Sequence, residues 1–260
     1  MKHKVNLISL VTTYMILSTP IHTSAQAIEF TPAQQEQIGK IAAEYLVSHP
    51  EVIIQATQRL QQQQQELEQK VFALKVMEHQ KSLVSDADTP VAGPDNAKVT
   101  VVQFFDYQCG YCSHLAPVME TVMDQNQDVR FVFKDWPIFA GKWVNSKNAA
   151  IRGLEVWKEK GQKAYLLFHN NLFKTGHING ELTINDIDTA AHSAGYSVSS
   201  SSVYDEVLER NDQLAQSLGL TGTPGVIVMP TANPTPARIT VLPGVPTKQQ
   251  LMAAIRKADK

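Results

Sequence analysis

The spacing of apolar residues divides this chain into a helical part and a mixed part. Residues 28 to about 84 are rich in glutamine and nearly free of glycine, and no stretch among them has the composition of a strand. Thr31 followed by Pro32 predicts the start of a first helix, and Ser48-His49-Pro50 predicts a break before a second. The turn-rich segment 86–96 then leads into the mixed part.

The second predicted helix, from about 50 to 84, carries apolar residues at a regular interval. They recur every seven positions: Ile53, Leu60, Leu67 and Leu74. At 1.5 Å per residue this helix is on the order of 50 Å long, too long for its own segment to cover. The spacing favours self-association as a dimer or larger assembly, although polar Thr57 and Gln64 weaken the heptad register. The alternatives are a helix folded back onto the rest of the chain, a solvated spacer at 61–65, or a docking surface for a different partner.

The mixed part begins with an apolar run, Val99–Phe105, whose β-branched and aromatic residues are typical of a strand buried on both faces. From Cys109 onward, apolar residues recur at intervals of three and four, as on one face of a helix. A second run, 129–133, predicts a strand parallel to the first, since a helix connects the two. These patterns predict an α/β fold.

The chain has two cysteines, and they open this helix as Cys109-Gly110-Tyr111-Cys112. Residues three apart share a face of a helix, so the two sulfurs can reach each other and close a disulfide. The first turn of a helix stabilises an anion through its unpaired N–H groups and its dipole, which favours the reactive thiolate. Cys109 is therefore the expected nucleophile and Cys112 the shielded resolving thiol, while Gly110 leaves the approach open.

The rest of the mixed part is predicted to be a helical stretch followed by a hairpin and a last helix. From about 140 to 220, apolar residues recur at helical intervals without a strand-like run. Two runs, 225–229 and 238–242, predict antiparallel strands joined by a proline-rich turn. Thr247 predicts the N-cap of the terminal helix.

Two further features make a family resemblance specific. Pro117 lies five residues after Cys112, where a thioredoxin-like active-site helix has its kinking proline, and Leu220-Thr221-Gly222-Thr223-Pro224 precedes a predicted strand. With these features, residues from about 90 to 260 resemble the DsbA/DsbC/DsbG family of bacterial periplasmic thiol:disulfide interchange proteins. The resemblance implies a thioredoxin fold with a helical insertion at about 140–220, in which a cis-proline at Pro224 faces the cysteines.

The resemblance also implies a function. The Cys-Gly-Tyr-Cys sequence and Thr223-Pro224 are similar to the isomerase DsbC rather than to the oxidase DsbA. The implied activity is a thiol:disulfide oxidoreductase that isomerises or introduces disulfides in exported proteins. Substrate then contacts Gly110, Tyr111, Thr223 and Pro224. No cofactor is expected beyond a redox-active disulfide between Cys109 and Cys112, and a membrane redox partner resets the thiols.

Two other functions fit the sequence less well. The cysteine pair can chelate copper or zinc with an outside ligand, but two thiols without a second pair make a poor closed zinc site, so no metal site is expected. A holdase-type chaperone acting through the glutamine-rich arm is the other alternative. The net charge of −2 and a pI near 6.4 give no electrostatic reason to expect nucleic acid as a partner.

Four polar residues near the cysteines carry separate expectations. Gln103 stands where relatives often have a buried acid that assists proton transfer, which puts that route in doubt here. Lys134 is expected to be exposed at the end of a strand, the alternative being a buried cation near the cysteines. Asp106 is expected to fix the loop or cap the helix, and His114 is expected to face solvent.

The amino-terminal residues have the pattern of a signal peptide. Lysines at positions 2 and 4 precede an apolar segment that runs through Leu17, and Ala25-Gln26-Ala27 is a small-x-small cleavage pattern. The expected organisation is therefore a signal peptide at 1–27, a helical oligomerisation arm at 28–88 and a catalytic domain at 89–260. The mature protein is expected in the periplasm, as a homodimer formed through residues 28–88.

Overall fold

The computed structural model describes residues 30–197 and 204–260. Contacts within the chain separate two compact units, Met1–Gln58 and Arg59–Lys260. The expected signal peptide at 1–27 lies outside the described residues. Among the helices that are described, none combines the length and apolar character required to cross a membrane.

The first unit contains helix α1 (Pro32–Ser48) and the start of helix α2 (Glu51–Glu78). The start of α1 follows from its sequence. The Thr31 hydroxyl accepts a hydrogen bond from the Gln34 N–H, the Gln34 side chain accepts one from the Thr31 N–H, and Pro32 occupies the first helical position. Helix α1 buries none of its residues. Its large apolar side chains are therefore exposed: Ile38, Ile41, Tyr45, Leu46 and Val47.

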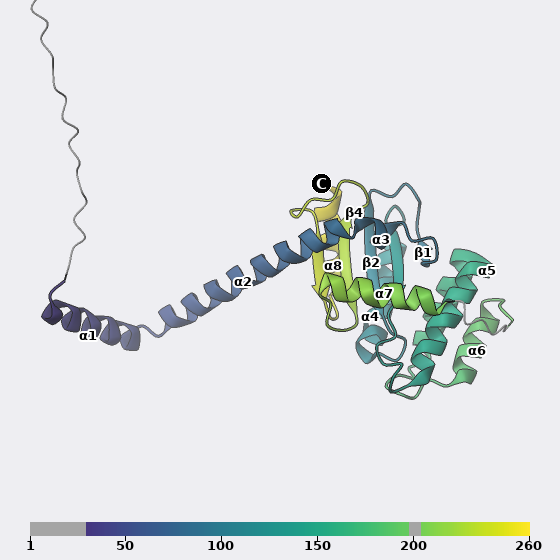
Figure 1. The fold of residues 1–260 in the computed structure, drawn as a ribbon, viewed down its shortest axis with the longest axis horizontal. Helices are drawn as coiled ribbons and strands as arrows, with labels where there is room; N and C mark the ends of the chain where they lie inside the picture. Colours follow the sequence, from purple (N-terminus) through teal and green to yellow (C-terminus); the bar gives the residue numbers. More distant parts are fainter. Residues whose placement is uncertain (1–29, 198–203) are drawn as a thin grey trace, which may run out of the picture. The chain divides into compact units, whose positions relative to one another are not determined.

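The second unit is built on a five-stranded sheet with the order β1-β3-β2-β4-β5 (Figure 1). The strands are β1 (Val91–Ala92), β2 (Val99–Phe105), β3 (Arg130–Asp135), β4 (Gly225–Pro230) and β5 (Thr240–Pro243). Strands β2 and β3 are parallel, as expected from the helix between them, and the other pairs are antiparallel. Every residue of β2 is buried, so this strand lies at the centre of the unit.

Helices cover both faces of the sheet, because side chains alternate between the faces along each strand. On one face, α4 (Gly110–Gln125), α5 (Val144–Lys174), α6 (Ile184–Ser193) and α8 (Lys248–Asp259) share a hydrophobic core with the strands. On the other face lie the end of α2, α3 (Gln80–Val84) and α7 (Asp205–Leu218), and in Figure 1 α3 and α7 pass in front of the strands. The expected thioredoxin fold is confirmed, and α5 to α7 form its helical insertion.

The second unit begins earlier than the expected start at Thr89. Val76 of α2 and Leu83 of α3 are fully buried in the core beneath the sheet. The Gln69 side chain also donates a hydrogen bond of 2.9 Å to the Val241 oxygen of β5. The helix expected to continue to about residue 84 is divided at His79, which allows α3 to pack on the sheet.

One expectation about β3 was wrong. Lys134 is not exposed at the strand end, because β3 continues through Asp135 and the Lys134 side chain is only 1% exposed. It shares the face of β3 that bears Val132, which packs with α3 and α7, and its ammonium contacts Asp86 and Thr89. The cysteine-bearing helix lies on the opposite face, so Lys134 is not a cation beside the cysteines either.

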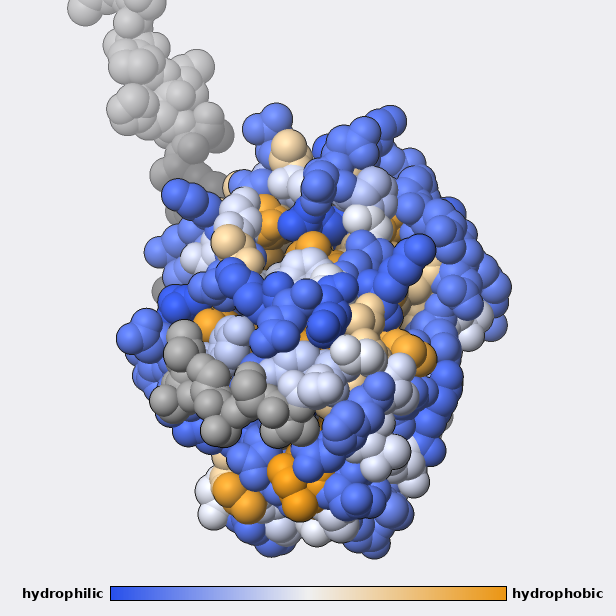
Figure 2. Space-filling view, turned by 90° about the vertical axis from the view of Figure 1, so that its right-hand side faces the viewer, coloured by the Kyte–Doolittle hydropathy of each residue, from blue (hydrophilic) through white to orange (hydrophobic). Residues whose placement is uncertain are grey.

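The surface near α5 and α6 is mainly hydrophilic. Figure 2 views the molecule from the side on which these helices lie in Figure 1, and hydrophobic residues gather there in small separate groups. Small apolar groups of this kind are ordinary on protein surfaces. In α1 and in the first turns of α2, by contrast, exposed apolar residues lie close together in the sequence, and Ile53 and Ile54 are two of them.

Replacing Leu83 with alanine tests whether the segment before Thr89 belongs to the second unit. Leu83 is fully buried, so Leu83→Ala is expected to lower the free energy of unfolding by about 2–5 kcal/mol. Leu167→Ala is the matched control, since Leu167 of α5 is 45% exposed, and it should change stability by no more than about 0.5 kcal/mol. Denaturant unfolding followed by circular dichroism measures both. Equal effects would show that α3 does not pack on the sheet.

Candidate active site

Cys109 lies at the junction between β2 and α4, where it is the N-cap residue of the helix. The chain turns sharply after Phe105, because Asp106 accepts hydrogen bonds from the residues that follow it. Its backbone oxygen accepts from the Cys109 N–H at 3.1 Å, and its carboxylate accepts from the Gln108 N–H at 2.8 Å. This turn directs the first N–H groups of α4 toward the Cys109 sulfur.

The Cys109 thiol is strongly acidified by its surroundings. Its pKa falls to about 6, chiefly because the Cys112 side chain donates a hydrogen bond to the Cys109 thiolate. Burial opposes this shift, whereas hydrogen bonds from Thr223 and from the N–H groups of Cys112 and Tyr111 add to it. Most of Cys109 is therefore ionised at neutral pH, where an ordinary cysteine is only a few per cent thiolate.

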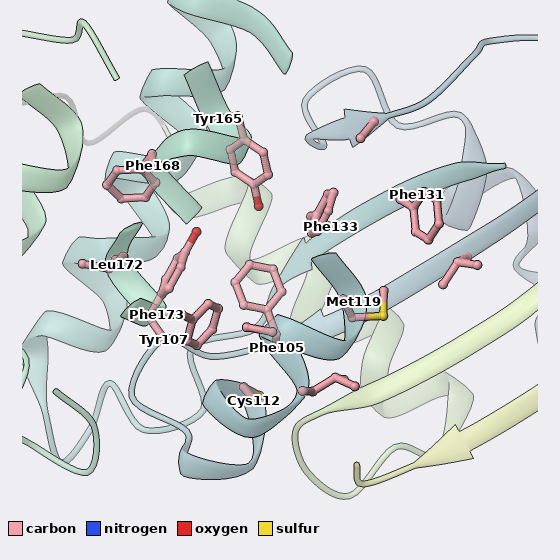
Figure 3. Close-up of a cluster of buried hydrophobic side chains, with 14 of the residues drawn as sticks. Phe105, Tyr107, Cys112, Met119, Phe131, Phe133, Tyr165, Phe168, Leu172 and Phe173 are labelled. Atoms are coloured by element: carbon pink, nitrogen blue, oxygen red, sulfur yellow. The ribbon is translucent and has the colours of Figure 1, made fainter. Parts of the chain in front are cut away.

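Cys112 is in the opposite situation. Cys112 is fully buried on the side of α4 that packs against the aromatic core. Figure 3 shows this core, with Phe105, Tyr107 and Phe173 among its labelled residues. Burial raises the pKa of the Cys112 thiol well above its usual value, and the hydrogen bond to Cys109 and the charge of that thiolate raise it further. The two sulfurs therefore have pKa values that are displaced in opposite directions.

The Thr223-Pro224 segment lies beside Cys109, as the resemblance implied. The peptide bond between the two residues is cis, and Pro224 is buried. In its thiol form, Cys109 donates a hydrogen bond of 3.3 Å from its sulfur to the Thr223 oxygen. The structure thus brings together residues that are more than one hundred positions apart in the sequence.

The two residues between the cysteines differ in their surroundings. Tyr111 is 66% exposed and presents its ring to solvent. Gly110 lies against the loop that follows α5, and a Cβ atom at this position would be 3.2 Å from Ile178 Cδ1. A side chain at position 110 would therefore push against Ile178, so this glycine keeps the loop close to the cysteines.

Gln108 is a site residue that sequence reasoning missed. It is 1% exposed and binds the loop after α5 through two hydrogen bonds. Its backbone oxygen accepts from the Asn179 N–H at 3.0 Å, and its side-chain oxygen accepts from the Gly180 N–H at 2.8 Å. The Asn-Gly pair in that loop is a turn signal, but no local pattern indicates where such a turn packs.

Asp106 joins the active-site turn to the helical insertion. Its second carboxylate oxygen accepts hydrogen bonds from the Phe139 N–H at 3.0 Å and from the Ser146 hydroxyl at 2.7 Å. Burial raises the pKa of this carboxyl despite these bonds. The expectation that Asp106 fixes the loop agrees with this geometry, and His114 is exposed as expected.

The position expected to hold a buried acid in relatives is occupied by Gln103, and a buried carboxyl lies elsewhere in the sheet. Gln103 is 1% exposed on β2, whereas a fully buried carboxyl, Asp135, lies at the end of β3 across from Phe105. Burial raises the pKa of Asp135 well above its usual value, and the nearby charge of Asp106 adds to the shift. In the part of the chain that the structure describes, no three His, Cys, Asp or Glu side chains are grouped as a metal site.

Comparison with known families gives two matches. Residues 100–255 match the DSBA-like thioredoxin domain, and residues 34–66 match the N-terminal domain of the copper resistance protein ScsC. Among curated proteins, disulfide bond formation protein D of Bacillus subtilis (strain 168) is 39% identical over 89 residues, which cover 33% of this chain and 38% of that protein. The alignment thus spans well under half of that relative's length.

Several solved structures resemble most of this chain. BcfH of Salmonella enterica Typhimurium is 36% identical with a TM-score of 0.72, and the alignment covers 88% of this chain and 97% of BcfH. ScsC of Proteus mirabilis, in a transitional conformation, is 28% identical with a TM-score of 0.62, covering 88% and 98%. The chain therefore belongs to the DsbA-like family of thiol-disulfide oxidoreductases and carries, ahead of its thioredoxin domain, a helical region like that of ScsC.

Proposed function

We propose that this protein is a periplasmic thiol:disulfide oxidoreductase that isomerises, and also introduces, disulfides in exported proteins. The observation that carries the proposal is the pair of opposed pKa shifts, which leaves Cys109 ionised and Cys112 protonated at neutral pH. The redox group is the reversible disulfide between these two cysteines. The leader-like pattern at 1–27 and the family of exported interchange proteins support the location.

The reaction begins with attack by the Cys109 thiolate on one sulfur of a substrate disulfide. A mixed disulfide forms, and the second substrate sulfur leaves with the electron pair as a thiolate. If another substrate thiolate then attacks the mixed disulfide, a rearranged substrate disulfide forms and Cys109 is released as a thiolate, with no net oxidation. If Cys112 attacks instead, the substrate leaves reduced and the Cys109–Cys112 disulfide forms. Oxidation of a substrate dithiol is the reverse of this second route.

The burial of Cys112 favours isomerisation over rapid resolution. Thiol–disulfide exchange requires a thiolate, and burial keeps the pKa of Cys112 well above neutral pH. Slow attack by the buried Cys112 is proposed to leave time for a second substrate thiol to attack the mixed disulfide. A membrane redox partner is proposed to reset the thiols after each net redox event.

The substrate is proposed to contact the residues that surround the Cys109 sulfur. Tyr111 offers an exposed aromatic ring, and Thr223 lies next to the sulfur. Gly110 adds no side chain of its own beside the sulfur, and Pro224 is the buried residue that follows Thr223. Tyr111, Gly110 and Thr223 are proposed to form a small surface for an extended cysteine-containing segment, with Pro224 directly behind Thr223 in the chain.

Self-association through the helical arm is proposed to bring several active sites together. Ile38, Ile41 and Tyr45 of α1 are spaced as on one helix face, and between 47% and 58% of each is exposed. Leu60, Leu67 and Leu74 of α2 form a separate exposed apolar row at seven-residue spacing. Such rows are typical of helices that pack against copies of themselves, so a homodimer or larger assembly is proposed.

Copper binding is not part of this proposal. The copper resistance in the description of ScsC belongs to that protein, and the matching residues 34–66 of this chain contain no cysteine. Zinc is not proposed either, because a pair of thiols supplies two of the four ligands of a closed zinc site.

The acidity of Cys109 predicts its reactivity profile. Alkylation of the reduced protein by iodoacetamide, followed by mass spectrometry, is expected to rise with pH and reach half its maximum near pH 6, because the thiolate forms as the pH passes the depressed pKa of about 6. Cys112→Ala removes the hydrogen bond with the largest effect on Cys109 and should move the midpoint upward. A wild-type midpoint near the ordinary cysteine pKa of about 8.5 would refute the assignment.

Reactivation of ribonuclease with scrambled disulfides tests the isomerase activity. The wild-type protein should restore ribonuclease activity, and Cys109→Ser should abolish this because the attacking thiolate is gone. Suppression of aggregation that survives in Cys109→Ser, with no reactivation by the wild type, would instead identify a holdase. Rapid oxidation of reduced ribonuclease without reactivation of scrambled ribonuclease would identify an oxidase.

Ile41→Glu tests the role of the arm. A charge in the exposed apolar row of α1 should prevent assembly, so the mass measured by light scattering should fall from a multiple of the chain mass to the mass of one chain. The variant should also have lower isomerase activity, while its oxidation of simple thiols should be unchanged. Ala43→Glu adds the same charge at an exposed position on the opposite side of α1 and should leave the assembly unchanged. A monomeric wild-type protein at micromolar concentration would contradict the proposal.

A further inference from the structure

A cavity of about 500 Å³ lies between α3 and α7, on the face of the sheet opposite to the cysteines. Its volume is in the range of small-molecule sites, about 300–1,000 Å³. Its lining is polar or charged apart from Leu214, and it holds three basic side chains, Lys81, Lys134 and Arg210, against the carboxylate of Asp86; a second carboxylate, Asp88, pairs with Arg210. The redox chemistry of Cys109 uses none of these residues.

Lys134 is a buried cation that has not used all its donors. Its ammonium lies 2.9 Å from Asp86 Oδ2 and 2.7 Å from Thr89 Oγ1, which accounts for two of its three N–H groups. Arg210 approaches the same carboxylate, with 3.7 Å between Arg210 Nη2 and Asp86 Oδ1, and reaches Asp88 at 3.0 Å. Burial lowers the pKa of Lys134, and the charge of Arg210 lowers it further. Two cations therefore converge on one carboxylate of the cavity.

Asn211 adds an unsatisfied acceptor to the same lining. It is 1% exposed, and its side-chain N–H group donates a hydrogen bond of 3.0 Å to the Asp135 backbone oxygen. That bond fixes the orientation of the Asn211 amide. The amide oxygen, Oδ1, accepts no hydrogen bond from the described residues. Because a buried acceptor without a donor costs free energy, a ligand that brings an O–H group is favoured here.

We propose that this cavity binds a small oxyanion that carries its own O–H group, as hydrogen phosphate and hydroxy acids do. The negative oxygens contact Lys81, Lys134 and Arg210, and the O–H group donates to Asn211 Oδ1. Charge-assisted hydrogen bonds of this kind are stronger than neutral ones, so the cations supply most of the affinity. The O–H group supplies the selectivity, because an anion without it leaves Asn211 unpaired.

Calorimetric titration of the full mature protein tests the site. Inorganic phosphate and malate are the two probes, and they distinguish a phosphate ligand from a carboxylate one. Sulfate and succinate are matched anions that lack the O–H group, and they should bind at least about tenfold more weakly. The expected result is saturable binding at one site per chain for phosphate, malate or both.

Three variants locate the binding. Arg210→Gln and Lys81→Gln should each weaken it about tenfold, and Lys81 is exposed, so its replacement does not threaten folding. Lys160→Gln removes the same charge from an exposed position outside the cavity and should leave binding unchanged.

The proposal fails if neither phosphate nor malate gives saturable binding. It also fails if sulfate binds as tightly as phosphate and succinate as tightly as malate, or if Lys160→Gln weakens binding as much as Lys81→Gln.

Discussion

The antiparallel pairing of β2 with β4 is the constraint on which the active site depends. Phe104 of β2 lies opposite Gly225 of β4, so the carboxyl end of one strand meets the amino end of the other. Cys109 follows the first strand and Thr223 precedes the second, which is why the Cys109 sulfur reaches the Thr223 oxygen at 3.3 Å. A one-residue shift in this register would turn every β2 side chain to the other face and separate the two loops.

The position of the two sulfurs relative to the core explains their opposite acidity. Cys109 accepts a hydrogen bond from the Cys112 side chain and sits where the N–H groups of α4 and the Thr223 segment meet, so its anion is stabilised. Cys112 lies one turn further, among the aromatic side chains of Figure 3, where an anion is poorly solvated. Asp106 and Gln108 hold this junction against the helical insertion, so the geometry does not rest on α4 alone.

The two faces of the sheet have different characters. The face with the cysteines is covered by four helices and packed with aromatic rings, among them Phe133 and Tyr165. The other face combines apolar contacts from Leu83 and its neighbours with a charged cavity around Lys134. One sheet therefore separates a redox site from a polar cavity, and neighbouring residues of β3 contribute to each side.

The sequence by itself determined the features that arise from local interactions. The cap at Thr31, the strand at Val99–Phe105 and the cysteine pair at the start of a helix follow from capping chemistry and from side-chain periodicity. The tertiary structure decided the burial of Lys134, the place of Asp135 and the contact of Gln108 with the loop after α5. These depend on which elements cover each face of the sheet, and that is set by packing between segments far apart in the chain, which no local pattern records.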